Sequence, residues 1–274
     1  MKRIVTIIVP ILLIAAAAHA DIHGSWTAST DEKSAGRMYL QVNRGSRMNM
    51  GTTMNISDFA GLSPAQINAG TSTPVQFELR REAGNVTFDG SFRKGDGAGQ
   101  FNFVPNRSFF SAIDGLGIRR DAGGDDDDLF SLAMHDVSTA FIRGMHAEGI
   151  RGDDLDQYLA MRIHRVTPEL VRELRALGFK NLEADELIAA RIHRVTPEYI
   201  RAMRAAGWDL TLGELQNSRI HGATPEFAEE MKQLGYGTLD HDKLVNFRIH
   251  RVTPEFIREL RALGYNDLTA DQLI

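Results

Sequence analysis

Five histidines recur at nearly constant spacing in the second half of the chain, and imidazole is a common metal ligand and proton carrier near neutral pH. They are His135, His164, His193, His221 and His250. Zinc needs its nitrogen ligands about 2 Å away, whereas neighbouring helices pack about 10 Å apart. The spacing therefore predicts structural histidines at the junctions between repeated units. A ligand-binding or pH-sensing role is the alternative.

A pair of arginines recurs with the same period and falls on one face of a predicted helix. The members are Arg172, Arg175, Arg201, Arg204, Arg258 and Arg261. One interpretation is a partner-binding stripe that faces an acidic partner. The other is a solvated face, neutralised by local pairs such as Glu169 with Arg172 that contribute a few tenths of a kcal/mol each. A weaker copy of the unit carries Glu229 and Lys232 at these positions.

Other side chains give no pattern of a catalytic, cofactor-binding or metal site. The absence of cysteine excludes disulfides, thiolate metal sites and a cysteine nucleophile. The run Asp125 to Asp128 lacks the alternating carboxylates of a calcium loop, and we expect a solvated loop there. Gly95, Gly97 and Gly99 precede a predicted strand, whereas a phosphate loop needs a helix. No His-Glu-x-x-His or Gly-x-Ser-x-Gly motif is present. We therefore expect a protein that is not an enzyme and binds no cofactor.

The recurring histidines belong to an octet that appears four times. It is clearest at residues 162–169, returns at 191–198 and 248–255, and is weaker at 219–226. Such self-similarity, with a period of about 29 residues, predicts an array of stacked units. Within each octet, Thr-Pro-Glu is typical of a helix start: Thr caps, Pro suits the first position and Glu favours the positive helix end.

Each unit is predicted to be a hairpin of two helices of roughly ten residues. Glycine ends the first helix in each clear copy, at Gly178, Gly207, Gly235 and Gly264. In the second helix, Leu187, Ile188, Ile192 and Val195 are expected to form an apolar stripe. Helices this short are marginal alone, so they are expected to persist by stacking on neighbouring units.

The first half has the two-residue apolar period of strands. Val75, Phe77 and Leu79 alternate with polar residues, and glycine-rich turns are predicted at 83–85 and 94–99. The predicted fold class is therefore two-part α+β: a small antiparallel sandwich or barrel over 21–105, followed by an α-solenoid-like array over 106–274. Its copies are degenerate over 106–161 and clear over 162–190, 191–218, 219–247 and 248–274.

The first twenty residues predict export. Lys2 and Arg3 precede an apolar run over 4–18, and Ala18-His19-Ala20 is a small-x-small cleavage site. The run is shorter than the roughly 20 residues that span a bilayer. We expect cleavage after Ala20 and a periplasmic or secreted protein without stable membrane insertion; an uncleaved anchor is the alternative. The formal net charge of −5 gives no reason to bind nucleic acid or anionic lipid.

Two stretches resemble a known family. Residues 252–265, Val-Thr-Pro-Glu-Phe-Ile-Arg-Glu-Leu-Arg-Ala-Leu-Gly-Tyr, resemble repeats in the extracytoplasmic tails of membrane metallopeptidases of the beta-lactam-sensor and antirepressor class. Residues 75–84 resemble the β segment that precedes those repeats. The zinc motif and membrane helices of the peptidase are missing here, so no catalytic residue is carried over. The resemblance implies a sensory or interaction module outside the cytoplasm.

These observations favour an exported, non-catalytic interaction or sensing module that binds a protein or peptide partner in the cell envelope. One alternative is a binder of envelope polymer or of a small ligand through the β domain. A second alternative is a hydrolase whose site has no recognisable motif.

Overall fold

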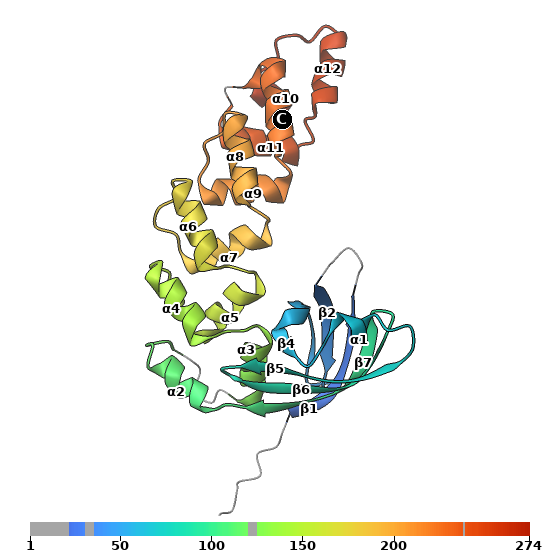
Figure 1. The fold of residues 1–274 in the computed structure, drawn as a ribbon. Helices are drawn as coiled ribbons and strands as arrows, with labels where there is room; N and C mark the ends of the chain where they lie inside the picture. The colour runs from blue at the N-terminus through green and yellow to red at the C-terminus, as the bar shows by residue number, and fades with distance from the viewer. Residues whose placement is uncertain (1–21, 31–35, 120–124, 238) are drawn as a thin grey trace, which may run out of the picture. The chain divides into compact units, whose positions relative to one another are not determined.

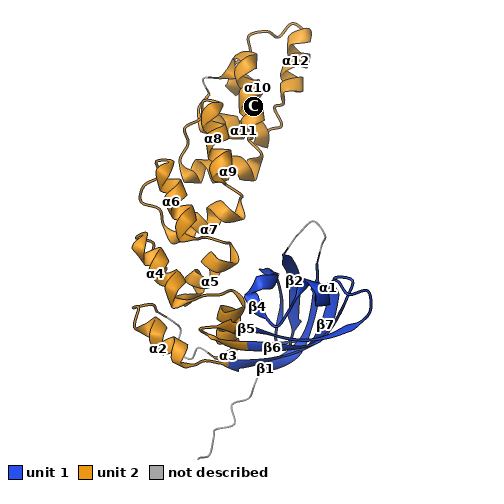
Figure 2. Cartoon of the chain, viewed as in Figure 1, with its two compact units in different colours: residues 1–79, 86–104 blue, residues 80–85, 105–274 orange. Residues whose placement is uncertain are grey.

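The structure is a computed structural model that describes residues 22–30, 36–119, 125–237 and 239–274. The chain forms two compact units (Figure 2). The β unit comprises Met1–Leu79 and Val86–Val104, and the helical unit comprises Arg80–Asn85 and Pro105–Ile274. The predicted signal peptide lies outside the described residues. In the described part of the chain, no helix is long and apolar enough to cross a membrane.

The β unit is built on one antiparallel sheet, whose strands in the described residues have the order β3-β2-β1-β7-β6-β5-β4. The strands are β1 (Ile22–Ser29), β2 (Arg37–Asn43), β3 (Asn49–Asn55), β4 (Phe59–Ala60), β5 (Thr73–Arg81), β6 (Gly84–Arg93) and β7 (Asp96–Pro105). A short helix, α1 (Pro64–Ile67), connects β4 to β5. The two-part α+β architecture predicted from the sequence is thereby confirmed.

The sheet curls strongly because its two edges are joined by a very short link. Strand β3 ends at Asn55 and β4 begins at Phe59, although they occupy opposite ends of the strand order. Four residue steps span at most about 14 Å, whereas the edges of a flat seven-stranded sheet would be about 29 Å apart. The result is a half-barrel (Figure 1). The prediction of a sandwich or closed barrel was wrong in this respect, because β3 pairs with β2 and β4 pairs with β5.

An aromatic cluster fills the curled sheet. Trp26 is 1% exposed, and its ring lies edge-to-face against Phe77 at 5.3 Å and tilted against Phe92 at 5.5 Å. Phe77 in turn stacks on Phe88 at 4.8 Å. The indole nitrogen of Trp26 donates a hydrogen bond to the carbonyl oxygen of Gln100, 3.1 Å away. Trp26 therefore has both an apolar environment and a partner for its one polar group.

The predicted turn over 94–99 is wrong in its extent. Only Lys94 and Gly95 lie between β6 and β7, and Gly99 lies inside β7, opposite Trp26 of β1. A Cβ atom at Gly99 would overlap the carbonyl oxygen of Asp89. The glycine is therefore required by close packing between strands, which a turn signal in the sequence does not distinguish.

We predict that Gly99→Ala lowers the free energy of unfolding by about 1–3 kcal/mol, because the added methyl group must displace the backbone of β6. Urea unfolding followed by tryptophan fluorescence measures the change. Gly70→Ala is the matched control, since a Cβ atom there meets nothing within 4 Å. Equal loss of stability in both variants would contradict this packing argument.

The helical unit contains short helices joined by short loops (Figure 1). They are α2 (Ser108–Asp114), α3 (Asp126–Met134), α4 (Thr139–Ala147), α5 (Leu155–Ile163), α6 (Pro168–Ala176), α7 (Ala184–Ile192), α8 (Pro197–Ala205), α9 (Leu212–His221), α10 (Pro225–Met231), α11 (His241–Ile249), α12 (Pro254–Ala262) and α13 (Ala270–Leu273). We call α4, α6, α8, α10 and α12 the first helices, and α3, α5, α7, α9, α11 and α13 the second helices. Helix α7 contacts α5 and α9, and α10 contacts α8 and α12, so like helices pack on like.

The predicted helix starts are confirmed. Thr167, Thr196, Thr224 and Thr253 are the N-caps of α6, α8, α10 and α12, and each hydroxyl accepts a hydrogen bond from the third amide of its helix. In each of these helices, proline follows the cap, where its missing N–H leaves no bond unmade. Local side-chain chemistry therefore fixes where each first helix begins.

The loop predicted for the acidic run was wrong. Asp125 caps α3 by accepting from the amides of Asp127 and Asp128, and the carboxylate of Asp128 accepts from the amide of Asp125. Asp126 to Asp128 form the first turn of that helix. Carboxylates are stabilised at this position by the positive end of the helix. The run thus starts a helix.

Candidate functional site

Arginine side chains join the C-terminal ends of successive first helices. Arg175, Arg204 and Arg261 each donate to a backbone carbonyl oxygen 27 residues earlier, which belongs to Glu148, Leu177 and Leu234 respectively. Glu148 and Leu177 are the C-caps of α4 and α6. The last carbonyl groups of a helix have no partner within it. An arginine of one hairpin therefore satisfies the helix end of the hairpin before it.

Two junctions between second helices have the same kind of bond. Arg162 Nε donates to the carbonyl oxygen of His135 at 2.9 Å, and Arg191 Nε donates to that of His164 at 3.0 Å, again over 27 residues. His135 and His164 are the C-caps of α3 and α5. The backbone of each of these two histidines contacts the following hairpin. The contact to the arginine is made by the backbone carbonyl oxygen of each histidine.

Of the other recurring histidines, His193 and His250 are the C-caps of α7 and α11, and His221 is the last residue of α9. The side chains of His221 and His250 are exposed, while those of His164 and His193 are half-buried. For His135, burial first and the positive charge of Arg162 second lower the pKa of the imidazole. The set therefore ends equivalent helices without gathering into one cluster.

The arginine that opens each octet is a residue whose role the sequence did not reveal. Arg162 contacts Asp136 at 2.7 Å and lies 5.0 Å from the centre of the Phe141 ring. The equivalent Arg248 lies 4.9 Å from the centre of the Phe227 ring. The recurrence of this arginine in every octet was the only feature of the sequence that indicated a role for it. The carbonyl oxygen of His135 and the carboxylate of Asp136 lie at the end of the preceding hairpin, whereas the Phe141 ring lies on the first helix of the same hairpin.

The weaker octet departs from this scheme. Arg219 stacks over Tyr199, with 3.7 Å from its guanidinium carbon to the ring centre. Lys232 replaces the second arginine of the first helix and pairs with Glu229 at 3.7 Å on its own helix. A wider π-type turn over Lys232–Tyr236 follows α10. The copy that has Lys232 in place of the arginine therefore also has a different C-terminal end of its first helix, α10.

The remaining arginines of the predicted stripe are exposed but charge-compensated. Arg172 contacts Glu148 at 2.8 Å and Glu169 at 2.7 Å. Arg201 contacts Glu173 at 3.2 Å and Glu198 at 3.8 Å. Arg258 contacts Glu230 at 3.9 Å and Glu255 at 3.2 Å. Each pairs with its own helix and with the preceding hairpin, so the stripe is an ion-pair network. Partner binding there stays a prediction.

An isoleucine follows each octet arginine and lies at the surface. Ile163, Ile192, Ile220 and Ile249 are 48%, 51%, 56% and 50% exposed. Each lies at or next to the C-terminal end of a second helix, and these helices contact one another in succession. The prediction that Ile192 belongs to a buried stripe was wrong, although Leu187 and Val195 are buried as expected. We call these four residues the isoleucine row.

A histidine outside the repeated set forms a partly buried pair with tyrosine. His146 Nε2 lies 2.6 Å from the hydroxyl of Tyr158, which also accepts from the amide of Gly152 at 3.0 Å. Tyr158 is fully buried. Burial and nearby Arg151 lower the pKa of His146, and burial raises the pKa of Tyr158. Both shifts favour the neutral forms, and the pair joins the loop after α4 to α5.

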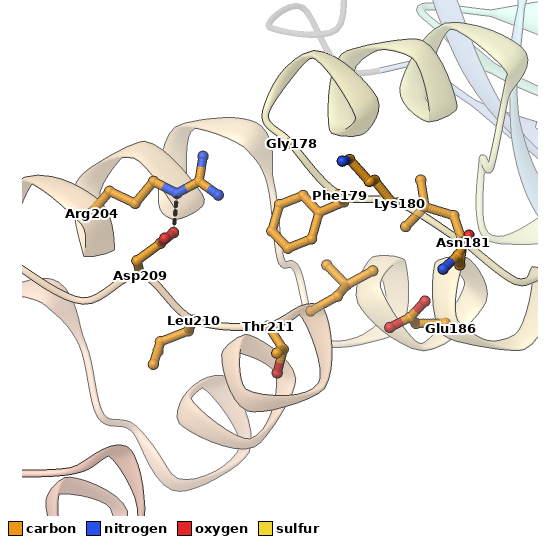
Figure 3. A pocket seen from close by; sticks show the side chains of 11 residues that line it. Gly178, Phe179, Lys180, Asn181, Glu186, Arg204, Asp209, Leu210 and Thr211 are labelled. Atoms are coloured by element: carbon orange, nitrogen blue, oxygen red, sulfur yellow. Dashed lines mark hydrogen bonds and ion pairs between the residues drawn. The ribbon is translucent and has the colours of Figure 1, made fainter.

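A partly open pocket of about 400 Å³ lies between the α6–α7 and α8–α9 loops (Figure 3). Arg204 and Asp209 pair across 2.8 Å on one side, and Lys180 lies on the other. Burial raises the pKa of Glu186 in the lining. The hydroxyl of Thr211, also in the lining, donates to Glu214 and its oxygen caps α9. The pocket offers charged groups of both signs to a small ligand.

Comparison with protein-family models, with curated proteins and with solved structures finds no match to this chain. The resemblance to metallopeptidase tails therefore stays a prediction. Among the residues that the structure describes, no three or more histidine, aspartate or glutamate side chains are placed to hold a metal ion.

We predict that Arg162→Ala lowers the free energy of unfolding by about 2 kcal/mol, because hydrogen bonds to a charged group contribute about 1.5–3 kcal/mol when buried. Arg201→Ala, which removes an exposed ion pair, should cost less than about 1 kcal/mol. Urea unfolding of the two variants measures both values. Equal losses of unfolding free energy in the two variants would contradict the prediction, because the bond from Arg162 to the carbonyl oxygen would then be no stronger than an exposed ion pair.

We also predict a pH dependence from His135. Because its pKa is lowered in the folded protein, the unfolded chain binds more protons between that pKa and about 6.5. The free energy of unfolding should therefore fall as the pH is lowered from 7 to 5. His135→Gln should reduce this slope. Unfolding curves at pH 7, 6 and 5 test this, and an unchanged slope in His135→Gln would refute it.

Proposed function

We propose that this protein is an exported, non-catalytic interaction or sensing module whose helices form an α-solenoid-like array with a period of about 29 residues. The starts of α6, α8, α10 and α12 at Pro168, Pro197, Pro225 and Pro254 support the period. The arginine bonds across 27 residues support the stacking of successive hairpins. Export rests on the sequence of residues 1–20. Arrays of this kind bind partners along an extended surface.

The observation that carries the proposal is the isoleucine row. One half-exposed isoleucine on a folded protein is ordinary. Four at the same place in four copies, on helices that contact one another, repeat an exposed apolar side chain from hairpin to hairpin. Contiguous exposed apolar surface is typical of sites that bind other proteins. We propose the isoleucine row as the surface that holds a protein or peptide partner in the cell envelope.

The packing of the helices supports the same surface. The second helices contact one another more extensively than the first helices do. We propose that this closer packing bends the stack of hairpins toward the second helices, so that they line its inner face. A curved inner face surrounds an elongated partner and buries more of it than a flat surface would. The isoleucine row lies on these helices.

The test is affinity recovery from a cell-envelope extract with the full chain as bait. The wild type should recover a partner that the double variant Ile192→Asp, Ile220→Asp does not. Val104→Asp is the matched control, since Val104 is 51% exposed in the β unit. Loss of the partner in Val104→Asp alone would move the binding surface to the β unit. Failure of the wild type to recover any partner would overturn the proposal.

A further inference from the structure

Unpaired arginines flank the isoleucine row. Arg165, Arg194 and Arg251 each lie two residues after an isoleucine of the row, and their side chains are exposed. Across the described residues, none of the three side chains forms a hydrogen bond or an ion pair. The arginines of the first helices differ, because Arg172 and Arg201 are neutralised by glutamates. The row therefore combines apolar side chains with uncompensated positive charge.

The backbone at these arginines is strained. Arg165, Arg194 and Arg251 have φ angles of 57°, 56° and 59°, in the left-handed region that disfavours residues with a Cβ atom. The fourth copy has Gly222 at this position, with φ of 73°. In the preceding unit, Asp136 has a similar φ of 56°, but it is held by Arg81 and Arg162. The three arginines have no such partner. An unfavourable backbone conformation that no contact within the protein compensates is typical of a functional position.

The spacing of the row defines the geometry of what it can hold. Neighbouring helices lie about 8–10 Å apart, so the isoleucines recur at about that step. A helix that carries an apolar residue at every seventh position presents one about every 10.5 Å along one face. An extended chain would also need partners for its backbone groups. Of the helices that carry the row, α5 already has its last carbonyl oxygen bonded by Arg191. A helix bonds its own backbone groups, so a helical occupant matches the step of the row and needs no such partners.

From these observations, we infer that the isoleucine row binds an acidic amphipathic helix of a partner protein. Apolar residues at every seventh position of that helix contact the isoleucines, and flanking aspartate or glutamate side chains pair with Arg165, Arg194 and Arg251. The inference rests on the proposed function, and it adds the chemistry of the partner. Helices with apolar anchors on one face commonly bind to apolar surfaces of other proteins.

The test uses the full chain and a synthetic helical peptide with four leucines, one at every seventh position, and glutamate on both flanks. A twin peptide carries lysine in place of glutamate. Fluorescence anisotropy should show the glutamate peptide binding at least about tenfold more tightly than its twin, with an affinity that falls as salt is raised. Equal binding of the two peptides would overturn the inference.

The key variant is Arg165→Gly, Arg194→Gly, Arg251→Gly. Glycine relieves the left-handed backbone, so this variant should fold with an unchanged or raised melting temperature. It should bind the glutamate peptide at least about fivefold more weakly, because each exposed ion pair contributes a factor of about two to five. Arg201→Ala is the control and should bind as the wild type does. An unchanged affinity in the triple variant would contradict the inference.

Two further measurements separate this inference from the alternatives. Vesicles rich in phosphatidylglycerol should not bind the chain. If they bind, and the triple variant loses that binding, the row is a membrane surface and the inference is wrong. If the envelope partner depends on Ile192 and Ile220 but the glutamate peptide fails to bind, only the partner chemistry is wrong. If neither binds, the proposed function fails as well.

Discussion

The helical unit depends on the bond from an arginine to the carbonyl oxygen at the end of the equivalent helix in the preceding hairpin. This bond spans 27 residues on both rows of helices, as Arg191 to His164 and Arg204 to Leu177 illustrate. Helices of nine residues are marginally stable alone, and their last carbonyl groups lack partners. A single side chain therefore completes one helix and joins it to the next. The hairpins joined by these bonds satisfy backbone groups of one another, whereas among the described residues the buried Nε of Arg248 has no hydrogen-bond partner.

Residues 80–85 form side-chain contacts with the first part of the helical unit. Arg81 contacts Asp136 at 3.2 Å, and Glu82 accepts from the amide of Thr139 at 2.9 Å at the start of α4. Terminal units of a stacked array need a cover of this kind. This hairpin tip between β5 and β6 therefore belongs to the helical unit, which explains why a boundary at residue 105 alone does not separate the two parts.

Features fixed by neighbouring residues could be predicted from the sequence, and features fixed by distant ones could not. Thr-Pro-Glu determines a helix start by local bonding, and the alternation at Val75, Phe77 and Leu79 determines a strand. Strand β3 shows no apolar alternation in the sequence, because it is an edge strand in which only Met54 is buried. The exposure of Ile192 depends on how α7 packs against its neighbours. The partner of Arg191 lies in another hairpin, so its role required the structure.

Native-state hydrogen exchange of Arg191→Ala tests most directly whether neighbouring hairpins stabilise each other through these bonds. We predict faster exchange of the core amides of both α5 and α7, because the bond from Arg191 to His164 joins these two helices. Exchange in α11, two hairpins away, should stay close to the wild-type rate. Faster exchange confined to the last turn of α7 would contradict the account, because the arginine would then stabilise only its own helix.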